Sequence, residues 1–286
     1  MVESGHVSEI RQLKYRPPDA SRGQVETMPF KMLRELNHGA TQRGDFHVLA
    51  VVQQGRGSVA IDFTTSMLEP QTVVSIRPGV VHRWIDIADV AGDVILFVPT
   101  APTPRARALV DGPVTAPCWR VRDATWPLIT AAVRHLRLEV GPDGPRRPNA
   151  DEVANLLLSA LLVRLAPPLA QDQHGNEVFH RFRTLVEQEF REHHDVGHYA
   201  QALGYDPRTL SRAAHSATGR SAKAYLDERV LLEARRLLAH DQLPPTRCAD
   251  RLGFPDASNF SAFFVRQSGV RPGAWQKAQR EQLHRP

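Results

Sequence analysis

The chain has 286 residues, of which 42% are hydrophobic and 23% are charged, and its formal net charge is +5. This length is enough for two domains that each bury a core. The sequence contains no apolar run typical of a signal peptide or a transmembrane helix, and its two cysteines form neither a disulfide framework nor a metal-binding spacing. These observations argue against a secreted disulfide scaffold and a membrane protein, and we expect a cytoplasmic protein with no membrane contact.

The first part of the chain is typical of a β-rich domain. Residues 1–24 are polar and contain Pro17 and Pro18, which favours an extended N-terminal arm. Short runs rich in Val and Ile follow up to about residue 98, each closed by Gly, Pro or Asp: FHVLAVVQQG, GSVAIDF, TVVSIRPG, VVHRWIDIA and DVILFVP. Such runs indicate a β-sandwich or β-barrel. The order of their turns, residues 55–57, then 78–82, then 92–93, resembles the cupin-like sensor domain, which implies a cupin-like β-barrel that binds a small-molecule effector.

Two histidines in this region are candidate functional residues. Metal-binding cupins supply two histidines and a glutamate from an early strand and a further histidine later, whereas here only His47 is early and no HxH motif surrounds it. We therefore expect no metal and no cofactor. His82 is then either a hydrogen-bonded core residue or a polar group facing a ligand cavity. Strand alternation places Trp84 on the same face as His82, as cavity lining or as plain core, so the candidate effector-binding residues are His47, His82 and Trp84.

Helical periodicity follows in residues 125–140 and 149–166. In the second of these helices, Leu158 and Leu162 widen the apolar stripe beyond one packing face. A second face could pair with another subunit as a symmetric homodimer, and its residues would be Leu157, Leu158, Leu161 and Leu162. The alternative is a helix wedged between the barrel and its partner helix. We expect a ligand-sensing and dimerisation domain over residues 25–166 and a polar linker, PPLAQDQHGN, over residues 167–176.

One short pattern appears twice in residues 177–286. Residues 196–219 and 243–269 each contain a short helical segment, a turn and a second helical segment that ends at glycine. Gly204 and Gly253 are placed to end the first segment of each copy, and Asp206 and Asp256 are placed to cap the second. One copy would fit an ordinary helical hairpin. Two copies joined by one long helix favour a pair of helix-turn-helix motifs.

This region resembles the DNA-binding domain of the AraC/XylS family of transcription regulators. The matching residues are Ala200, Leu203, Gly204, Leu210, Ser211, Arg212, Thr218 and Gly219 in the first copy; Arg229, Ala234, Arg235, Leu237 and Leu238 in the linking helix; and Ala249, Leu252, Gly253, Phe254, Ser258, Phe260, Ser261, Phe264, Gly269 and Pro272 in the second copy. The resemblance implies that the second helix of each motif enters the major groove, and most of the chain's positive excess falls in this part.

The candidate DNA-binding residues lie around the starts of these two helices. In the first copy they are Arg208, Thr209, Ser211 and Arg212, and in the second copy they are Asp256, Ala257, Ser258 and Asn259, with Arg266 further along. Arg208 and Arg212 are one turn apart and could each make a bidentate contact with guanine, although Arg212 could instead bind phosphate. The second copy carries Ala262 where the family commonly has Arg, so we expect it to position the domain through backbone contacts, with Asn259 able to read adenine.

The sequence therefore predicts an α+β chain, with a cupin-like β-barrel and dimerisation helices followed by an all-α domain that carries two helix-turn-helix motifs. The predicted function is that of a sequence-specific transcription regulator without enzymatic activity. Its expected partners are promoter DNA, a small-molecule effector, a second copy of the chain and RNA polymerase, and the sign of regulation is open. Two alternatives remain: a cupin-type metalloenzyme fused to a DNA-binding module, with His47 and His82 as ligands, and a ligand-independent DNA-binding dimer.

Overall fold

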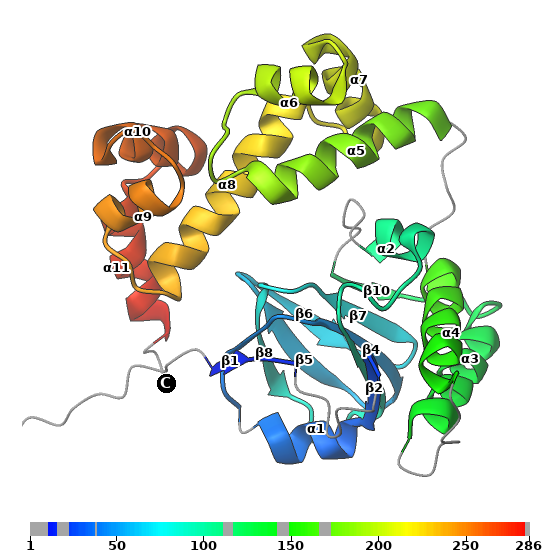
Figure 1. Ribbon diagram of the computed structural model, residues 1–286. Helices are drawn as coiled ribbons and strands as arrows, with labels where there is room; N and C mark the ends of the chain where they lie inside the picture. The colour runs from blue at the N-terminus through cyan, green and yellow to red at the C-terminus, as the bar shows by residue number, and fades with distance from the viewer. Residues whose placement is uncertain are drawn as a thin grey trace, which may run out of the picture. The chain divides into compact units, whose positions relative to one another are not determined.

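The computed structural model describes residues 11–15, 23–37, 39–110, 117–141, 149–165 and 173–283. The chain divides into two compact units, residues 1–168 and 169–286, and each is described by itself below. Figure 1 shows that the first unit combines sheets with helices, whereas the second is built of helices. The mixed α+β composition expected from the sequence is therefore confirmed.

The strands of the first unit form two five-stranded sheets. The first sheet has the order β1 (Arg11–Leu13), β3 (Gln42–Gly44), β8 (Val81–Asp86), β5 (Gly57–Ile61) and β6 (Thr64–Leu68). The second has the order β10 (Cys118–Arg120), β7 (Thr72–Ile76), β4 (His47–Gln54), β9 (Ala91–Phe97) and β2 (Val25–Pro29). Within the described ranges no strand pairing joins the two sheets, so the barrel is not closed by backbone hydrogen bonds.

Alternation along β4 explains how the sheets and helices pack in layers. Val48, Ala50 and Val52 lie in the core between the two sheets, while Leu49 and Val51 lie in the core between the second sheet and the helices. Successive side chains of a strand point to opposite faces, so a strand that is apolar at every position must be covered on both sides. The continuous apolar run in β4 therefore places the second sheet in the middle of the unit.

Three helices cover the outer face of the second sheet: α2 (Pro104–Val110), α3 (Trp126–Val140) and α4 (Ala150–Leu165). A further helix, α1 (Phe30–Asn37), places the Phe30 ring edge-on to Trp84 with the ring centroids 5.8 Å apart. Sequence reasoning missed α1, which lies before the first of the predicted strand runs, and α2, which follows the last of them. It also missed β1, which lies inside the predicted arm and pairs in parallel with β3.

The predicted dimerisation residues of α4 are mostly internal. Leu158 and Leu161 are 0% exposed and Leu162 is 5% exposed, because all three pack in the core that α4 shares with α3 and the second sheet. Leu157 is partly buried against the same core. The alternative of a helix wedged against its neighbours therefore describes these leucines, and the proposed second face at Leu158, Leu161 and Leu162 is wrong.

The second unit is organised around one long helix, α8 (Ala222–Ala239). Along α8, Figure 1 shows one group formed by α5 (Gln173–Glu189), α6 (Val196–Leu203) and α7 (Pro207–Thr218), and another formed by α9 (Pro245–Arg251), α10 (Ala257–Ser268) and α11 (Pro272–Leu283). A single buried core runs through both groups. Helix α5 begins at Gln173, inside the segment predicted as a linker, and residues 167–172 of that segment lie outside the described residues.

No helix in the described ranges is long and apolar enough to cross a membrane. Cys118 and Cys248 are both free thiols, which agrees with the absence of a disulfide framework expected from the sequence. Cys248 is buried in the core of the second unit, as expected for a small apolar residue.

Candidate nucleic-acid interface

The turn between α6 and α7 has the predicted helix signals. Gly204 ends α6 with a φ of 73°, in the left-handed region where a residue without Cβ is least strained. The Asp206 carboxylate then accepts hydrogen bonds from the backbone N–H groups of Arg208 at 2.9 Å and Thr209 at 3.1 Å, and Pro207 occupies the first position of α7. Hydrogen bonds from the Thr209 hydroxyl and backbone lower the pKa of Asp206, so the charged cap is favoured at neutral pH.

Helix α7 has one buried face and one exposed face. Leu210 is 0% exposed and packs in the unit's core, whereas Arg208 and Arg212 are exposed. Ser211 is only partly exposed, and its hydroxyl accepts a hydrogen bond from the backbone N–H of Ala222 at 3.4 Å. The two arginines therefore share the outer face of α7, while Ser211 faces the start of α8 rather than pointing freely outward.

Hydrogen bonds link three side chains in sequence along the exposed start of α7. The Thr209 hydroxyl donates to the Asp206 carboxylate at 2.6 Å, and the Arg212 guanidinium donates to the Thr209 hydroxyl at 3.4 Å. Thr209 is therefore engaged by the helix cap and by Arg212. The sequence pattern identified these three positions, but not that they contact one another.

The second copy begins in the same way, with fewer long side chains. The Asp256 carboxylate accepts the backbone N–H of Asn259 at 2.7 Å and its side-chain amide at 2.9 Å. Ser258 is exposed and Ala257 is partly buried, while Phe260 anchors the helix at 0% exposure. To present both its amide oxygen and its amide N–H groups to a base, the Asn259 side chain would have to break its hydrogen bond with Asp256.

Further along α10, Arg266 is exposed and its guanidinium lies over the ring of Phe263, 5.6 Å from the ring centroid. The two second helices thus differ in charge: α7 carries two arginines in its first half, and α10 carries its one arginine in its last turn.

Helix α8 joins the two motifs through polar contacts that the sequence pattern did not reveal. Asp227 is buried and contacts Lys223 on α8 at 2.6 Å and the side-chain amide of Gln267 on α10 at 3.0 Å. Lys223 also donates to the carbonyl of His194, in the turn before α6. The spacing of Lys223 and Asp227 is the available sequence signal for one of these contacts, since residues four apart are neighbours on a helix.

The three predicted effector-binding residues do not share a cavity. His47 lies on the helix-covered face of the second sheet, where its ring stacks on Phe97 with centroids 4.7 Å apart. His82 and Trp84 lie between the sheets, because they pair with Ile61 and Val59 of the inter-sheet core. The second sheet therefore separates His47 from His82, which rules out a common metal site and corrects the predicted effector site.

Both histidines are buried and favour the neutral form. Burial, with smaller contributions from Arg77 and Arg107, lowers the pKa of His47 to about 3. Burial also lowers the pKa of His82 to about 4, despite the hydrogen bond of its ring with the Val80 carbonyl. Trp84 is 1% exposed and belongs to the core. His82 is therefore the hydrogen-bonded core histidine of the two alternatives.

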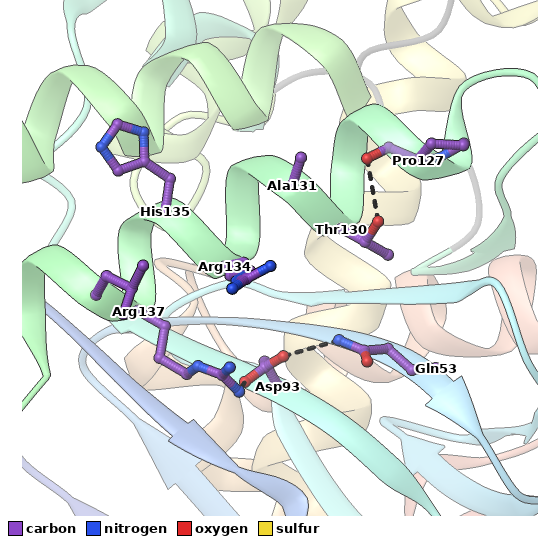
Figure 2. Close-up of a pocket in the computed structure, with 9 residues that line it drawn as sticks. Gln53, Asp93, Pro127, Thr130, Ala131, Arg134, His135 and Arg137 are labelled. Atoms are coloured by element: carbon purple, nitrogen blue, oxygen red, sulfur yellow. Dashed lines mark hydrogen bonds and ion pairs between the residues drawn. The ribbon is translucent and has the colours of Figure 1, made fainter.

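The first unit has a groove elsewhere, between α3 and strands β4 and β9. Its volume is about 460 Å³, and its lining residues are Gln53, Asp93, Pro127, Thr130, Ala131, Arg134, His135, Arg137 and Leu138. Figure 2 shows Arg137 and Gln53 reaching the same carboxylate of Asp93 from α3 and β4, at 3.1 and 2.9 Å. This contact ties α3 to the second sheet at the floor of the groove. The sequence pattern did not indicate this groove, because its residues come from three separate segments.

Residues 199–278, which contain both motifs, match a family model described as a helix-turn-helix domain. The transcriptional activator RhaR of Cronobacter sakazakii is 23% identical over 54% of this chain and 58% of its own length, and RhaR of Shigella dysenteriae is 21% identical over 81% and 84%. The solved DNA-binding domain of the transcriptional factor AdpA, in complex with a target DNA, is 28% identical over 36% of this chain and 95% of that domain, with a TM-score of 0.32.

The match with the first of these relatives thus spans less than two thirds of that relative. The family model nevertheless spans both motifs, whose caps, glycine ends and buried anchors are described above. Residues 199–278 of this chain therefore form a helix-turn-helix domain of the AraC type, and the chain is similar to transcriptional activators that are members of that family.

Proposed function

We propose that this chain regulates transcription by binding promoter DNA through α7 and α10, with α7 reading bases and α10 mainly positioning the domain. The observation that carries this proposal is the exposed pair Arg208 and Arg212, one turn apart on the face of α7 opposite the buried Leu210. Arginine is the commonest reader of guanine in the major groove, where its fork matches two acceptors of the base. Arg266 is the corresponding long cation of α10 and is placed for a phosphate contact.

The relatives named above are transcriptional activators, which supports activation as the mode of regulation. We extend the proposal accordingly to contact with RNA polymerase and to action as a homodimer. With three of the α4 leucines internal, the large apolar side chains that this helix exposes are Leu156 and Val163, which are 55% and 43% exposed. They are seven residues apart and share one helix face, so they replace the leucines as the proposed dimer contact.

A small-molecule effector bound to the first unit remains part of the proposal. The groove beneath α3 is the candidate place, because its volume suits a small ligand and its lining includes Arg134, His135 and Arg137. Because Asp93 already engages Arg137, Arg134 is the cation that favours an effector with a carboxylate or phosphate group. An enzymatic role has no comparable support, because the metal set it requires is divided by the second sheet.

The proposal is tested by selecting bound DNA from a random pool with the intact protein at stated salt. We expect a recurring motif with two segments about one helical turn apart, because the two motifs would contact successive major grooves. The double variant R208A/R212A should lose the preference in one segment. Lys277→Ala removes one exposed charge from α11 and serves as the matched control, with its sequence preference retained.

Enrichment of no motif by the wild-type chain, with and without candidate effectors, would contradict the proposed base reading. A preference unchanged in R208A/R212A would assign base reading to other residues.

A further inference from the structure

Three side chains with metal-ligating atoms meet where α5 ends and α6 begins. Glu189 is the last residue of α5, His193 lies in the following turn and His198 lies on α6. One ligand atom of each lies within 4.8 Å of the other two, and all three side chains are partly buried. In the described part of the chain, these residues form the one cluster of three His, Cys, Asp or Glu side chains that could hold a metal ion. Neither the DNA-binding proposal nor the effector proposal uses them.

The local fold holds these residues in place. The Nε2 atom of His198 lies 2.6 Å from an Oε2 atom of Glu189, and the rings of His193 and His198 stack with centroids 3.6 Å apart and planes at 10°. The hydroxyl of Tyr199, which is 0% exposed, donates to the backbone carbonyl of His193 at 2.8 Å. The backbone N–H of His193 donates in turn to the carbonyl of Glu189 at 3.0 Å. The backbone of His193 is thus held between Tyr199 and Glu189 before any ion binds.

The chemistry of the set selects a class of ion. Two imidazoles and one carboxylate are the ligands of open zinc sites, in which water takes the fourth position. Imidazole nitrogen is a poor ligand for Mg²⁺ or Ca²⁺, which prefer oxygen. Tetrahedral Zn²⁺ with bonds of about 2.0–2.1 Å needs ligand atoms about 3.3 Å apart. Because a metal ion lies in the plane of each imidazole that binds it, the stacked rings of His193 and His198 must tilt apart to share one ion, and the partial exposure of all three side chains leaves room for this rotation.

We propose that Glu189, His193 and His198 bind one divalent transition-metal ion of the Zn²⁺ class. The ion would replace the close contact between His198 and Glu189 and draw His193 into the same shell. It would thereby tie the end of α5 to α6, the first helix of the first helix-turn-helix motif. Because α6 packs against both α7 and α8, occupancy of this site would stabilise the part of the domain that presents Arg208 and Arg212. The site could not be recognised from the sequence pattern. Its residues are separated by three and four intervening residues, but they do not lie on one helix, because α5 ends between the first and the second of them.

The test uses the full-length protein after treatment with a chelator. Co²⁺ is titrated in as a spectroscopic probe, Zn²⁺ is then added to displace it, and thermal unfolding is followed with and without Zn²⁺. We expect one equivalent of Co²⁺ with visible absorption typical of four or five ligands, displacement by Zn²⁺, and a higher unfolding midpoint with Zn²⁺. Mg²⁺ should produce neither effect.

Three variants remove one ligand each: E189Q, H193A and H198A. Each should bind Co²⁺ at least about tenfold more weakly, because a lost ligand costs no less than a lost supporting contact. The control is His215→Ala, which removes an exposed histidine of α7 from the same unit and should bind as the wild type does. E189Q preserves the histidine pair and keeps the test valid if an alanine variant fails to fold.

Absence of Co²⁺ absorption and of a Zn²⁺-dependent shift in the wild-type protein would overturn the proposal and leave a hydrogen-bonded Glu–His pair. Equal binding by the wild type and by all three ligand variants would overturn it as well, by placing the ion elsewhere.

Discussion

Glu233 accepts a hydrogen bond from the guanidinium of Arg229, one turn earlier on α8, at 3.3 Å. The same carboxyl group, 8% exposed, also contacts Arg191 at 2.9 Å and Arg236 at 3.3 Å. Burial alone would raise the pKa of Glu233, but the guanidinium groups of Arg229, Arg236 and Arg191 outweigh burial and hold this pKa at about 2. Because Arg191 lies two residues after the end of α5, this carboxylate joins the end of α5 to α8.

Replacing this carboxylate should destabilise the DNA-binding unit. Glu233→Gln leaves three guanidinium groups around a neutral amide, and we expect the free energy of unfolding to fall by about 3–5 kcal/mol. Denaturant titration measures this change. The matched control is Glu228→Gln, which removes an exposed partner of Arg220 and should cost less than about 1 kcal/mol. Equal costs for the two variants would contradict the central role of Glu233.

The stability that the Glu233 carboxylate contributes should depend on pH. A carboxyl group whose pKa is lower in the folded chain contributes stability above its ordinary pKa of 4.5 and loses that contribution as the pH falls toward 2. The stability difference between the wild type and Glu233→Gln should therefore narrow below about pH 4.5. A difference that is constant with pH would show that packing, and not charge, causes the effect.

The buried histidines give the first unit an acid sensitivity of the same direction, which begins at a higher pH. The unfolded chain takes up protons on His47 and His82 near pH 6.5, whereas the folded chain does so only near pH 3 and 4. Stability should therefore decrease as the pH falls below about 6.5, because protons bind the unfolded state more strongly. The double variant H47Q/H82Q should flatten this dependence in urea titrations, and the exposed His135→Gln should not. An unchanged slope in the double variant would show that other groups cause the acid sensitivity.

Substitutions at two leucines of α4 should differ in their effect on the stability of the monomer. Leu158→Ala removes a side chain that is 0% exposed, and we expect a loss of about 2–5 kcal/mol from the lost contacts and the cavity. Leu156→Ala, two residues away and 55% exposed, should change the stability of the monomer by no more than about 0.5 kcal/mol. Thermal unfolding at protein concentrations where the chain is monomeric measures both.

The proposed dimer contact is tested separately by L156D/V163D in sedimentation. The double variant should lower the mass of a dimeric wild type to that of a monomer while its circular dichroism is unchanged. An unchanged mass would exclude this face of α4 as the interface.

On DNA, Arg212→Ala should weaken binding to the selected site by about 1–3 kcal/mol and relax the preference at one base pair. Arg266→Ala should weaken binding about equally for all sequences, because a phosphate contact carries no base information. Competition binding against single-base variants of the site separates the two effects. A uniform loss in Arg212→Ala would make Arg212 a phosphate contact.

The helix-turn-helix motifs could be located from the sequence because their signals are local. Asp206 followed by Pro207, and a glycine at each helix end, act within one or two turns of backbone and need no partner from elsewhere in the chain. The apolar strand runs of the first unit were recognisable for the same reason. Helices α1 and α2 were missed, since each is a short helix beside strand or proline signals and is stabilised by packing.

The predicted effector site illustrates the limit of a single sequence. Alternation correctly placed His82 and Trp84 on one face of β8, because that relation holds within one strand. Which side of the second sheet His47 faces depends on the registers of β4 with β9 and on the helices that cover this sheet. The leucines of α4 were assigned to an outward face for a similar reason. Their apolar stripe is wide because it packs in a core that α4 shares with α3 and the second sheet.

The sequence by itself determined the double helix-turn-helix, its capping residues and the arginines that α7 presents, since each follows from contacts a few residues apart. Only the tertiary structure decided that the sheets stay separate, that His47 and His82 lie apart, and that Glu233 joins α5 to α8. It also brought Glu189, His193 and His198 together across a helix end. The relations of the sheets, of the two histidines and of Glu233 arise from the packing of segments distant in the chain, where burial on both faces, rather than local preference, selects the partner of each side chain.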